Sequence, residues 1–220
     1  MFTASRVRAE LLRERYPFVA EVMTLYLALL EVWANTPIDP QRIVKATETA
    51  GPRPLALAVR DIDVDEALRK WERGEEVTPA ERYLARACSR GKAMTKLDGP
   101  CPHCGGAPQL SIRPLADEPL VNGHRQLMCA RCAHLWNHSG SACPSCGETT
   151  GAKRTLYGDE TQFPHLRVDA CSTCQRYLID VDLRRDHRAV PEVDELAALP
   201  LDLYAAEHGL TKITPNLMGF

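Results

Sequence analysis

Hydrophobic side chains recur at helical spacing through most of the first hundred residues. The widest apolar stripe covers residues 18–33, "FVAEVMTLYLALLEVW", directly after Pro17, which can occupy the first position of a helix. A stripe this wide must be covered by other helices, so the pattern predicts an α-helical domain. Further helices are expected over residues 41–50, over residues 64–73 between Asp63 and Gly74, and from the capping box "TPAE" at Thr78 to about Lys96.

The pattern changes after Gly99 and Pro100 to short stretches of alternating character separated by glycine and proline. Alternation over a few residues is typical of strands. The C-terminal part returns to helical spacing over residues 191–208, with a kink or break at Pro200. The sequence therefore predicts an α+β fold, with strands at residues 109–113, 125–128, 166–170 and 177–181 between the helical front and a C-terminal helix.

Composition and charge narrow the functional classes. The chain has 220 residues, 45% of them hydrophobic, which is enough to bury a core in one large or two small domains. Its 27 basic and 29 acidic side chains give no basic excess that would favour nucleic acid or an anionic membrane. The N-terminal residues show no export signal, so we expect a cytoplasmic protein. The apolar segment of residues 18–33 is too short to span a membrane and carries two glutamates, so no membrane insertion is expected.

Eight of the nine cysteines form two rows with the same spacing. Both rows read C-x2-C-x24-C-x2-C, and each cysteine of the second row lies 42 residues after its counterpart in the first. The same offset superimposes Gly105 on Gly147 and Arg125 on Arg167, which indicates an internal duplication of one small module. The first row consists of Cys101, Cys104, Cys129 and Cys132, and the second of Cys143, Cys146, Cys171 and Cys174.

This spacing has a physical reason if each row binds one metal ion. Two cysteines separated by two residues can wrap a turn around a cation, while backbone N–H groups bond the sulfurs and a glycine after the second cysteine supplies a positive φ. We therefore predict that the eight cysteines are the ligands of two ions, one in each row. Cys88 is expected to be a buried small hydrophobe, and His103, His134 and His138 are expected to be turn or surface residues.

Other chemistries can use the same residues. Disulfides are disfavoured in a reducing compartment. A dithiol redox catalyst needs one C-x-x-C pair at the start of a helix, so four pairs in tandem argue against it. An iron–sulfur cluster can take four thiolates, although its ligand spacing is often less symmetric. Among single ions, zinc and mononuclear iron both suit such a site, and the spacing does not separate them. A closed four-thiolate site leaves no position for metal-dependent hydrolysis.

The charge around the cysteines argues against a zinc-ribbon nucleic-acid binder. Residues 100–180 contain seven basic and seven acidic side chains. Each four-thiolate site with a divalent ion adds two negative charges, which brings the segment to a charge of about −4 and repels a phosphate backbone. We interpret Asp180, Asp182 and Asp186 as charged loops or helix caps rather than catalytic residues.

The order of these motifs resembles the formate dehydrogenase accessory protein family, FdhE. The resemblance rests on the helical front, on "CPHCGGAP", "CARCAHLW", "CPSCGETT" and "CSTCQRYL", on the acidic helix "PEVDELAALPLDLYAAEHG", and on the ending "GLTKITPNLMGF". It implies a cytoplasmic, non-enzymatic assembly chaperone that binds the catalytic subunit of formate dehydrogenase before export. It also implies two rubredoxin-like modules that hold iron, with zinc as the alternative, at the eight paired cysteines.

The predicted organisation has four parts. An α-helical domain over residues 1–98 is followed by metal modules over residues 99–140 and 141–182, and by a C-terminal helix and tail over residues 183–220. No catalytic residues and no organic cofactor are expected. The alternative function is a rubredoxin-like iron electron-transfer protein, and a nucleic-acid-binding protein is the weaker alternative.

Overall fold

The computed structural model describes residues 2–35, 37–115 and 125–220. They form two compact units, one of residues up to Asp98 with Leu217–Gly219 and one of Gly99–Asn216 with Phe220. The combination of helices with a sheet that carries two four-cysteine clusters confirms the predicted α+β fold. The predicted division of the chain into four parts stays a prediction. Among the described helices, none combines the length and the apolar character that crossing a bilayer requires.

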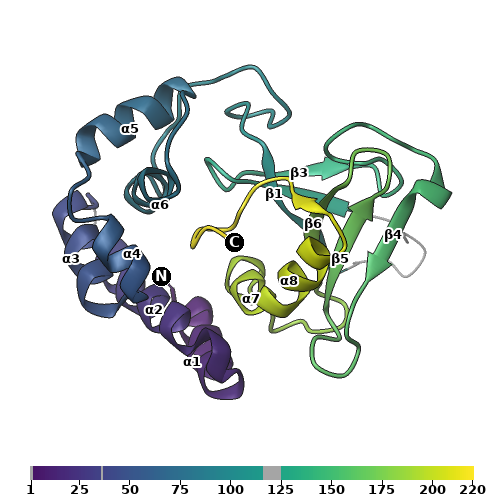
Figure 1. Ribbon diagram of the computed structural model, residues 1–220, viewed down its shortest axis with the longest axis horizontal. Coiled ribbons are helices and arrows are strands. Elements are labelled where there is room, and N and C mark those ends of the chain that lie inside the picture. The colour runs from purple at the N-terminus through teal and green to yellow at the C-terminus, as the bar shows by residue number, and fades with distance from the viewer. Residues whose placement is uncertain (1, 36, 116–124) are drawn as a thin grey trace. The chain divides into compact units, whose positions relative to one another are not determined.

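The first unit is helical, as the periodicity predicts. Residues 17–33 form a short 3-10 turn, Pro17–Val19, and then α2, whose Met23 and Leu29 are fully shielded from solvent. Neighbouring helices α1 and α3 pack against α2 and cover its wide apolar stripe. The helices are α1 (Thr3–Arg15), α2 (Ala20–Trp33), α3 (Pro40–Ala50), α4 (Arg53–Ala58), α5 (Val64–Arg73) and α6 (Pro79–Cys88) (Figure 1).

Helix ends in this unit follow the capping signals at most positions. Thr78 closes the predicted capping box at α6, and Gly74 ends α5 in the left-handed conformation. The prediction that α6 reaches Lys96 is wrong. The helix stops at Cys88 because the chain turns after it, with Gly91 at a φ of 74°. Cys88 is fully buried, which confirms its expected place in the core.

The second unit is built on one sheet with the strand order β3-β2-β1-β6-β5-β4 (Figure 1). This order contains two groups of three strands, one of β1, β2 and β3 and one of β4, β5 and β6. Neighbouring strands within each group are antiparallel, whereas β1 and β6 pair in parallel and join the two groups. The four predicted strands correspond to β1, β2, β5 and β6, and the others were not predicted. The strands are β1 (Pro108–Arg113), β2 (Arg125–Cys129), β3 (Leu135–His138), β4 (Arg154–Tyr157), β5 (Leu166–Cys171), β6 (Arg176–Asp182) and β7 (Thr211–Lys212), which pairs with β6.

Two short helices pack against this sheet. The helix expected over residues 191–208 is divided into α7 (Pro191–Ala197) and α8 (Leu199–Glu207), so the break falls at Ala198, just before Pro200. Helix α7 contacts β1 and β6, and α8 contacts β5. The helix pair therefore covers strands from both halves of the sheet, and Val193 and Leu196 of α7 are buried.

The sheet shows the duplication in its register. Leu127 pairs with Trp136, and Asp169 pairs with Leu178, so both partners shift by the 42 residues that separate the cysteine rows. The first strands of the two groups, β1 and β4, do not follow this offset. Leu127 pairs with Ser111 on β1 and Asp169 pairs with Leu156 on β4, so these partners are 45 residues apart instead of 42. A 3-10 turn, Gly151–Lys153, precedes β4, and the connection from β4 to β5 is correspondingly shorter than that from β1 to β2.

Candidate metal centres

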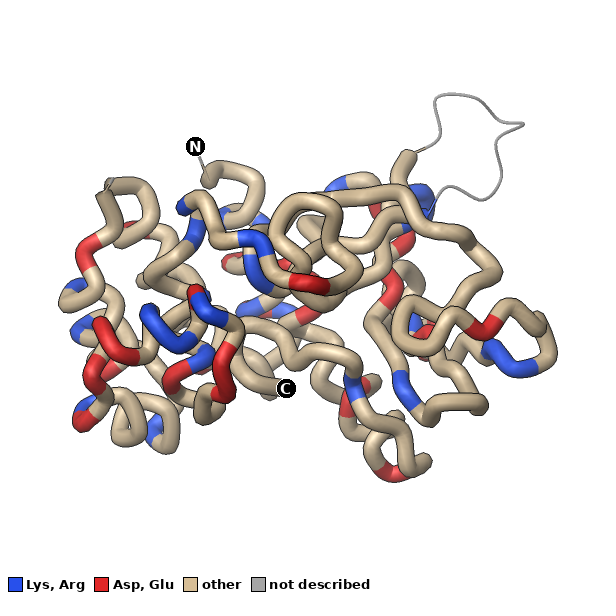
Figure 2. The backbone as a smooth tube through the Cα atoms, turned by 90° about the horizontal axis from the view of Figure 1, so that it is seen from above, with Lys and Arg blue, Asp and Glu red and all other residues tan. Residues whose placement is uncertain are grey.

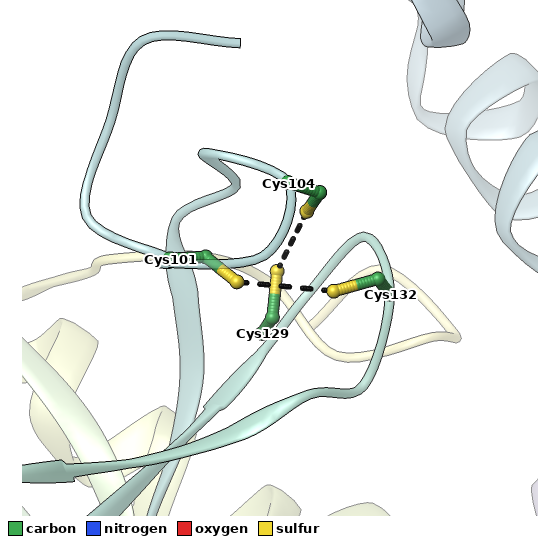
Figure 3. Close-up of side chains that lie close together, drawn as sticks. All are labelled: Cys101, Cys104, Cys129 and Cys132. Atoms are coloured by element: carbon green, nitrogen blue, oxygen red, sulfur yellow. Dashed lines mark hydrogen bonds between the residues drawn. The ribbon is translucent and has the colours of Figure 1, made fainter. Parts of the chain in front are cut away.

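The first cluster joins two turns that lie at the ends of strands. The turn with Cys101 and Cys104 precedes β1, and the turn with Cys129 and Cys132 connects β2 to β3. Their four sulfur atoms converge on one point, as Figure 3 shows, and all lie within 4.8 Å of one another. The sulfurs of Cys101 and Cys132 are 3.8 Å apart, and those of Cys104 and Cys129 are 3.5 Å apart.

The second cluster repeats this arrangement around β4, β5 and β6. The sulfurs of Cys143 and Cys174 are 3.8 Å apart, and those of Cys146 and Cys171 are also 3.8 Å apart. All four again lie within 4.8 Å of one another. The structure thus brings together every cysteine that the two rows single out, with the grouping that the 42-residue offset predicts.

These separations fit a single tetrahedral ion. With metal–sulfur bonds of about 2.3 Å, a regular tetrahedron places its sulfur atoms about 3.8 Å apart. A disulfide requires a sulfur–sulfur distance of about 2.0 Å, and all nine cysteines are free thiols. Each cluster could therefore hold one ion of zinc or iron, for which four thiolates are a suitable ligand set.

The turns around the sulfurs have the backbone conformation that the ligand spacing requires. Gly105 and Gly147 follow the second cysteine of their pairs with φ values of 74° and 76°, as expected from the sequence. Ala133 and Gln175 occupy the same position in the other two pairs, and both have a φ of 56° despite carrying a side chain. All four turns thus contain one residue in the left-handed conformation after the second cysteine. The sequence predicted this conformation only for the two turns in which that residue is glycine.

Backbone N–H groups and burial act in opposite directions on the cysteine thiols. Burial raises the pKa of Cys132 to about 11 and that of Cys143 to about 12. Burial also opposes ionisation of Cys171, yet hydrogen bonds from the N–H groups of Cys174 and Thr173 and from the side chains of Cys143 and Cys146 together outweigh it and lower the Cys171 pKa to about 7. A bound cation would favour the thiolate form at every position, because it compensates the negative charges that burial disfavours.

The two clusters differ in exposure. Three cysteines of the first are buried and Cys132 is half-buried, whereas the second includes the exposed Cys146. His103 and His134 lie next to the first cluster in the sequence, but both are exposed and their rings stack on each other at 5.4 Å. These two histidines are therefore surface residues, as expected.

A glycine behind the first cluster is required by close packing. A methyl group on Gly106 would lie 2.7 Å from the Cys129 sulfur and 3.0 Å from Cγ of Arg131. Overpacking of this kind costs about 1–3 kcal/mol, so we expect Gly106→Ala to weaken metal binding at the first site by about tenfold. The equivalent position of the second module is Glu148, which shows that the second site tolerates a side chain there.

Competition with a chromogenic chelator measures this effect. The measurement is made in a protein that also carries Cys146→Ser, which removes a ligand of the second cluster, so that the measured affinity is that of the first site alone. Gly151→Ala is the matched control, because a methyl group at that position meets no atom within 4 Å and should leave the affinity unchanged. Equal affinities for Gly106→Ala and the control would contradict the packing argument.

A buried polar network that the sequence analysis did not identify connects the two modules. Arg125 is fully buried, donates from Nε to the Ser111 hydroxyl at 2.7 Å, and forms an ion pair with Asp169. Ser111 in turn donates to Asp180 at 2.6 Å, across the parallel pairing of β1 with β6. The repeated arginine in the duplication, Arg125 and Arg167, could have indicated this network in the sequence, because Arg167 also forms an ion pair with Asp180.

The interpretation of Asp180 and Asp182 as loop or cap residues is wrong. Both lie on β6 and are buried, because β6 is a central strand between β1 and β5. Asp180 accepts from Nε of Arg113 at 2.7 Å, and Asp182 pairs with Arg184 at 2.7 Å. Both carboxylates therefore form ion pairs that stabilise the sheet.

Comparisons with known proteins agree with this architecture. Residues 142–218 match the family described as "FdhE, C-terminal domain". The fold is similar to the crystal structure of the FdhE protein from Pseudomonas aeruginosa, with a TM-score of 0.63 and 23% identity over 99% of this chain and 95% of that one.

Curated relatives point to the same family. A "Protein FdhE homolog" of Aquifex aeolicus (strain VF5) is 32% identical over 120 residues, which are 54% of this chain and 41% of the relative. A homolog from Pseudomonas aeruginosa is 34% identical over 124 residues, 54% of this chain and 38% of the relative. The matched segment thus spans about two fifths of these relatives, and the comparisons together confirm the resemblance to the FdhE family.

Proposed function

We propose that this chain, a relative of the FdhE proteins, is a non-enzymatic accessory factor for formate dehydrogenase. In this proposal it works in the cytoplasm and binds the catalytic subunit before export, and its eight paired cysteines hold two metal ions. The observation that carries the proposal is the FdhE match over residues 142–218, which contains the second cysteine cluster, both short helices and most of the C-terminal tail. The fold that surrounds this segment supports the same assignment.

The metal sites suit a binding protein better than a hydrolase. All four thiolates of a cluster would be ligands, so a bound ion would keep no position for substrate. Each ion would cross-link turns from different strands and stabilise a small module that has little core of its own. Iron is the metal we favour, with zinc as the alternative, and the ion's role is to hold the strands and turns of a binding surface in place.

Charge supports a protein partner over nucleic acid. Figure 2 shows Lys and Arg interspersed with Asp and Glu along the described part of the chain, a mixed pattern that does not favour binding to a phosphate backbone. Several of the basic side chains on the sheet are also used in ion pairs, as for Arg125 and Arg154 with Asp169.

Gene deletion and complementation in the native organism test the proposal. We expect deletion to abolish formate dehydrogenase activity while the catalytic subunit is still synthesised at its normal level. The wild-type chain should restore activity and capture the catalytic subunit in a pull-down. Normal formate dehydrogenase activity in the deletion strain would contradict the proposed function.

One observation favours electron transfer as a second candidate function. The exposed Cys146 brings the second cluster to the surface, where an iron ion could exchange electrons with a partner. Reversible reduction of the purified iron protein by a physiological donor, at rates matching turnover, would support this function. Zinc at both sites would eliminate it, because zinc has no redox chemistry.

A further inference from the structure

The second unit contains an open pocket that neither metal site uses. It has a volume of about 460 Å³ and lies between the end of β4, the following loop and the first turns of α8. This volume falls in the range of ligand pockets in proteins. We name it the β4 pocket; the residues that matter to its chemistry are Leu156, Tyr157, Asp159, Phe163, Leu201 and Tyr204.

The β4 pocket has a buried apolar floor and an exposed apolar rim. Phe163 and Leu201 are 2% and 6% exposed and form the floor, whereas Leu156 and Tyr204 are 47% and 39% exposed. Large apolar side chains that line a concave surface while remaining exposed are characteristic of interaction sites. The rim therefore has apolar surface that a ligand can bury.

The aromatic side chains of the rim are held in position by their neighbours. The ring centroids of Tyr157 and Tyr204 are 5.6 Å apart, and the Tyr204 ring also contacts the His208 ring, tilted by 31°, with a centroid distance of 4.0 Å. A site whose side chains are already ordered loses less conformational entropy on binding. Tyrosine faces also attract cations, with guanidinium and ammonium groups as the usual partners.

Among the pocket-lining residues that the structure describes, Asp159 carries the one charged side chain. One of its carboxylate oxygens accepts bonds from the Thr161 hydroxyl at 2.6 Å and from the N–H groups of Thr161 and Gln162 at 2.9 and 3.1 Å. Hydrogen bonds from the Thr161 hydroxyl and from these N–H groups lower the Asp159 pKa, so the carboxylate is ionised at neutral pH. The pocket thus combines apolar and aromatic walls with one fixed negative charge.

The position of the pocket indicates an extended peptide rather than a compact small molecule. Strand β4 ends the sheet, so within the described residues its outer edge pairs with no other strand. An extended segment can add to such an edge through its main chain and place alternate side chains in neighbouring pockets. Leu156 and Tyr157, which both line the cavity, belong to β4, so the β4 pocket lies beside this edge strand.

We propose that the β4 pocket binds an extended segment of a partner protein in which an arginine or lysine is flanked by apolar residues. The basic group of the segment would lie with the two tyrosine rings on one side and the carboxylate of Asp159 on the other. The apolar residues of the segment would cover Leu156 and the pocket floor. This inference holds whether or not formate dehydrogenase is the partner, because it rests on the pocket alone.

Selection from a random peptide library displayed on phage tests the inference. The immobilised full-length protein is compared with Asp159→Asn, which removes the charge but keeps an oxygen for the N–H groups, and with Tyr204→Ala. Leu203→Ala is the matched control, because Leu203 is the preceding residue on α8, is 57% exposed and does not line the pocket. The wild type and Leu203→Ala should enrich the same peptides, with a basic residue among apolar ones.

The affinity of an enriched peptide, measured by fluorescence anisotropy, gives the magnitude. We expect Asp159→Asn and Tyr204→Ala each to weaken binding about tenfold, and Leu203→Ala to leave it unchanged. Circular dichroism confirms that the variants are folded. Failure to enrich peptides, enrichment of acidic ones, or equal binding by the Asp159→Asn protein would overturn the proposal. Self-association that Tyr204→Ala abolishes would instead assign the pocket to a second copy of the chain.

Discussion

Replacing Cys129 with serine is expected to reduce the bound metal from two ions per chain to one and to unfold the first module. The Cys129 sulfur is buried and lies 3.5 Å from that of Cys104, as one of the four ligand atoms of the first cluster. A serine hydroxyl is a poor substitute for a thiolate ligand, so the site would lose its ion. Structural zinc sites supply about 10–16 kcal/mol of apparent binding free energy, and a module this small has little else to replace it.

Metal analysis and thermal unfolding of the Cys129→Ser protein measure this effect. Cys88→Ala is the control, since Cys88 is buried in α6 of the other unit and is a member of neither cluster. The control should retain two ions and lose only about 1 kcal/mol of stability to a small cavity. Two ions in the Cys129→Ser protein, or loss of an ion from Cys88→Ala, would refute the assignment of the first site.

Replacing Lys212 with methionine is expected to lower the free energy of unfolding by about 3–5 kcal/mol. The Lys212 side chain is 6% exposed and lies 2.9 Å from the Glu195 carboxylate and 3.1 Å from that of Asp202. Glu195 is fully buried and also accepts from Gln109. Removal of the Lys212 ammonium group would take its positive charge away from two buried carboxylates, Glu195 on α7 and Asp202 on α8.

The loss should depend on pH in a defined direction. Burial raises the pKa of Glu195, and the ion pair with Lys212 opposes that shift. A carboxyl whose folded-state pKa is raised favours the folded protein when it is protonated, and that contribution is lost as the pH rises. Without Lys212 the carboxylate has less compensation, so the deficit should be larger at about pH 8 than at about pH 5.

Urea denaturation at both pH values provides the measurement. Lys153→Met is the matched control, because Lys153 is an exposed lysine in the same unit, and its replacement should change stability by less than about 0.5 kcal/mol. A second substitution, Glu195→Gln, should recover part of the loss in the Lys212→Met protein. Equal stabilities for Lys212→Met and Lys153→Met would contradict the proposed role of the buried lysine.

The sequence was most informative where local geometry determines the structure. Cysteine spacing predicts both clusters because a C-x-x-C turn has few conformations that direct both sulfurs to one ion, and the offset of 42 residues fixes their grouping. The cap at Thr78 predicts the start of α6 for the same reason, since its hydrogen bonds lie within one helical turn. Each C-x-x-C turn and the helix cap form within a few residues of the chain.

The features that the sequence did not reveal depend on contacts between distant segments. Asp180 reads as a surface residue until β1 pairs with β6 and places Ser111 and Arg113 beside it. Strand β4 lies where the duplication is not exact, because a 3-10 turn precedes it and its pairing with β5 is shifted by three residues. Equal spacing between the cysteines concealed this shift, since a shorter loop after β4 compensates for the added turn.

Native mass spectrometry of the protein purified without oxygen tests most directly whether two thiolate tetrads each bind one cation. We expect a single dominant species that carries two metal ions and no inorganic sulfide. A mass without metal but lower by the hydrogens of disulfide bonds would contradict this expectation, as would masses that include the sulfide of an iron–sulfur cluster.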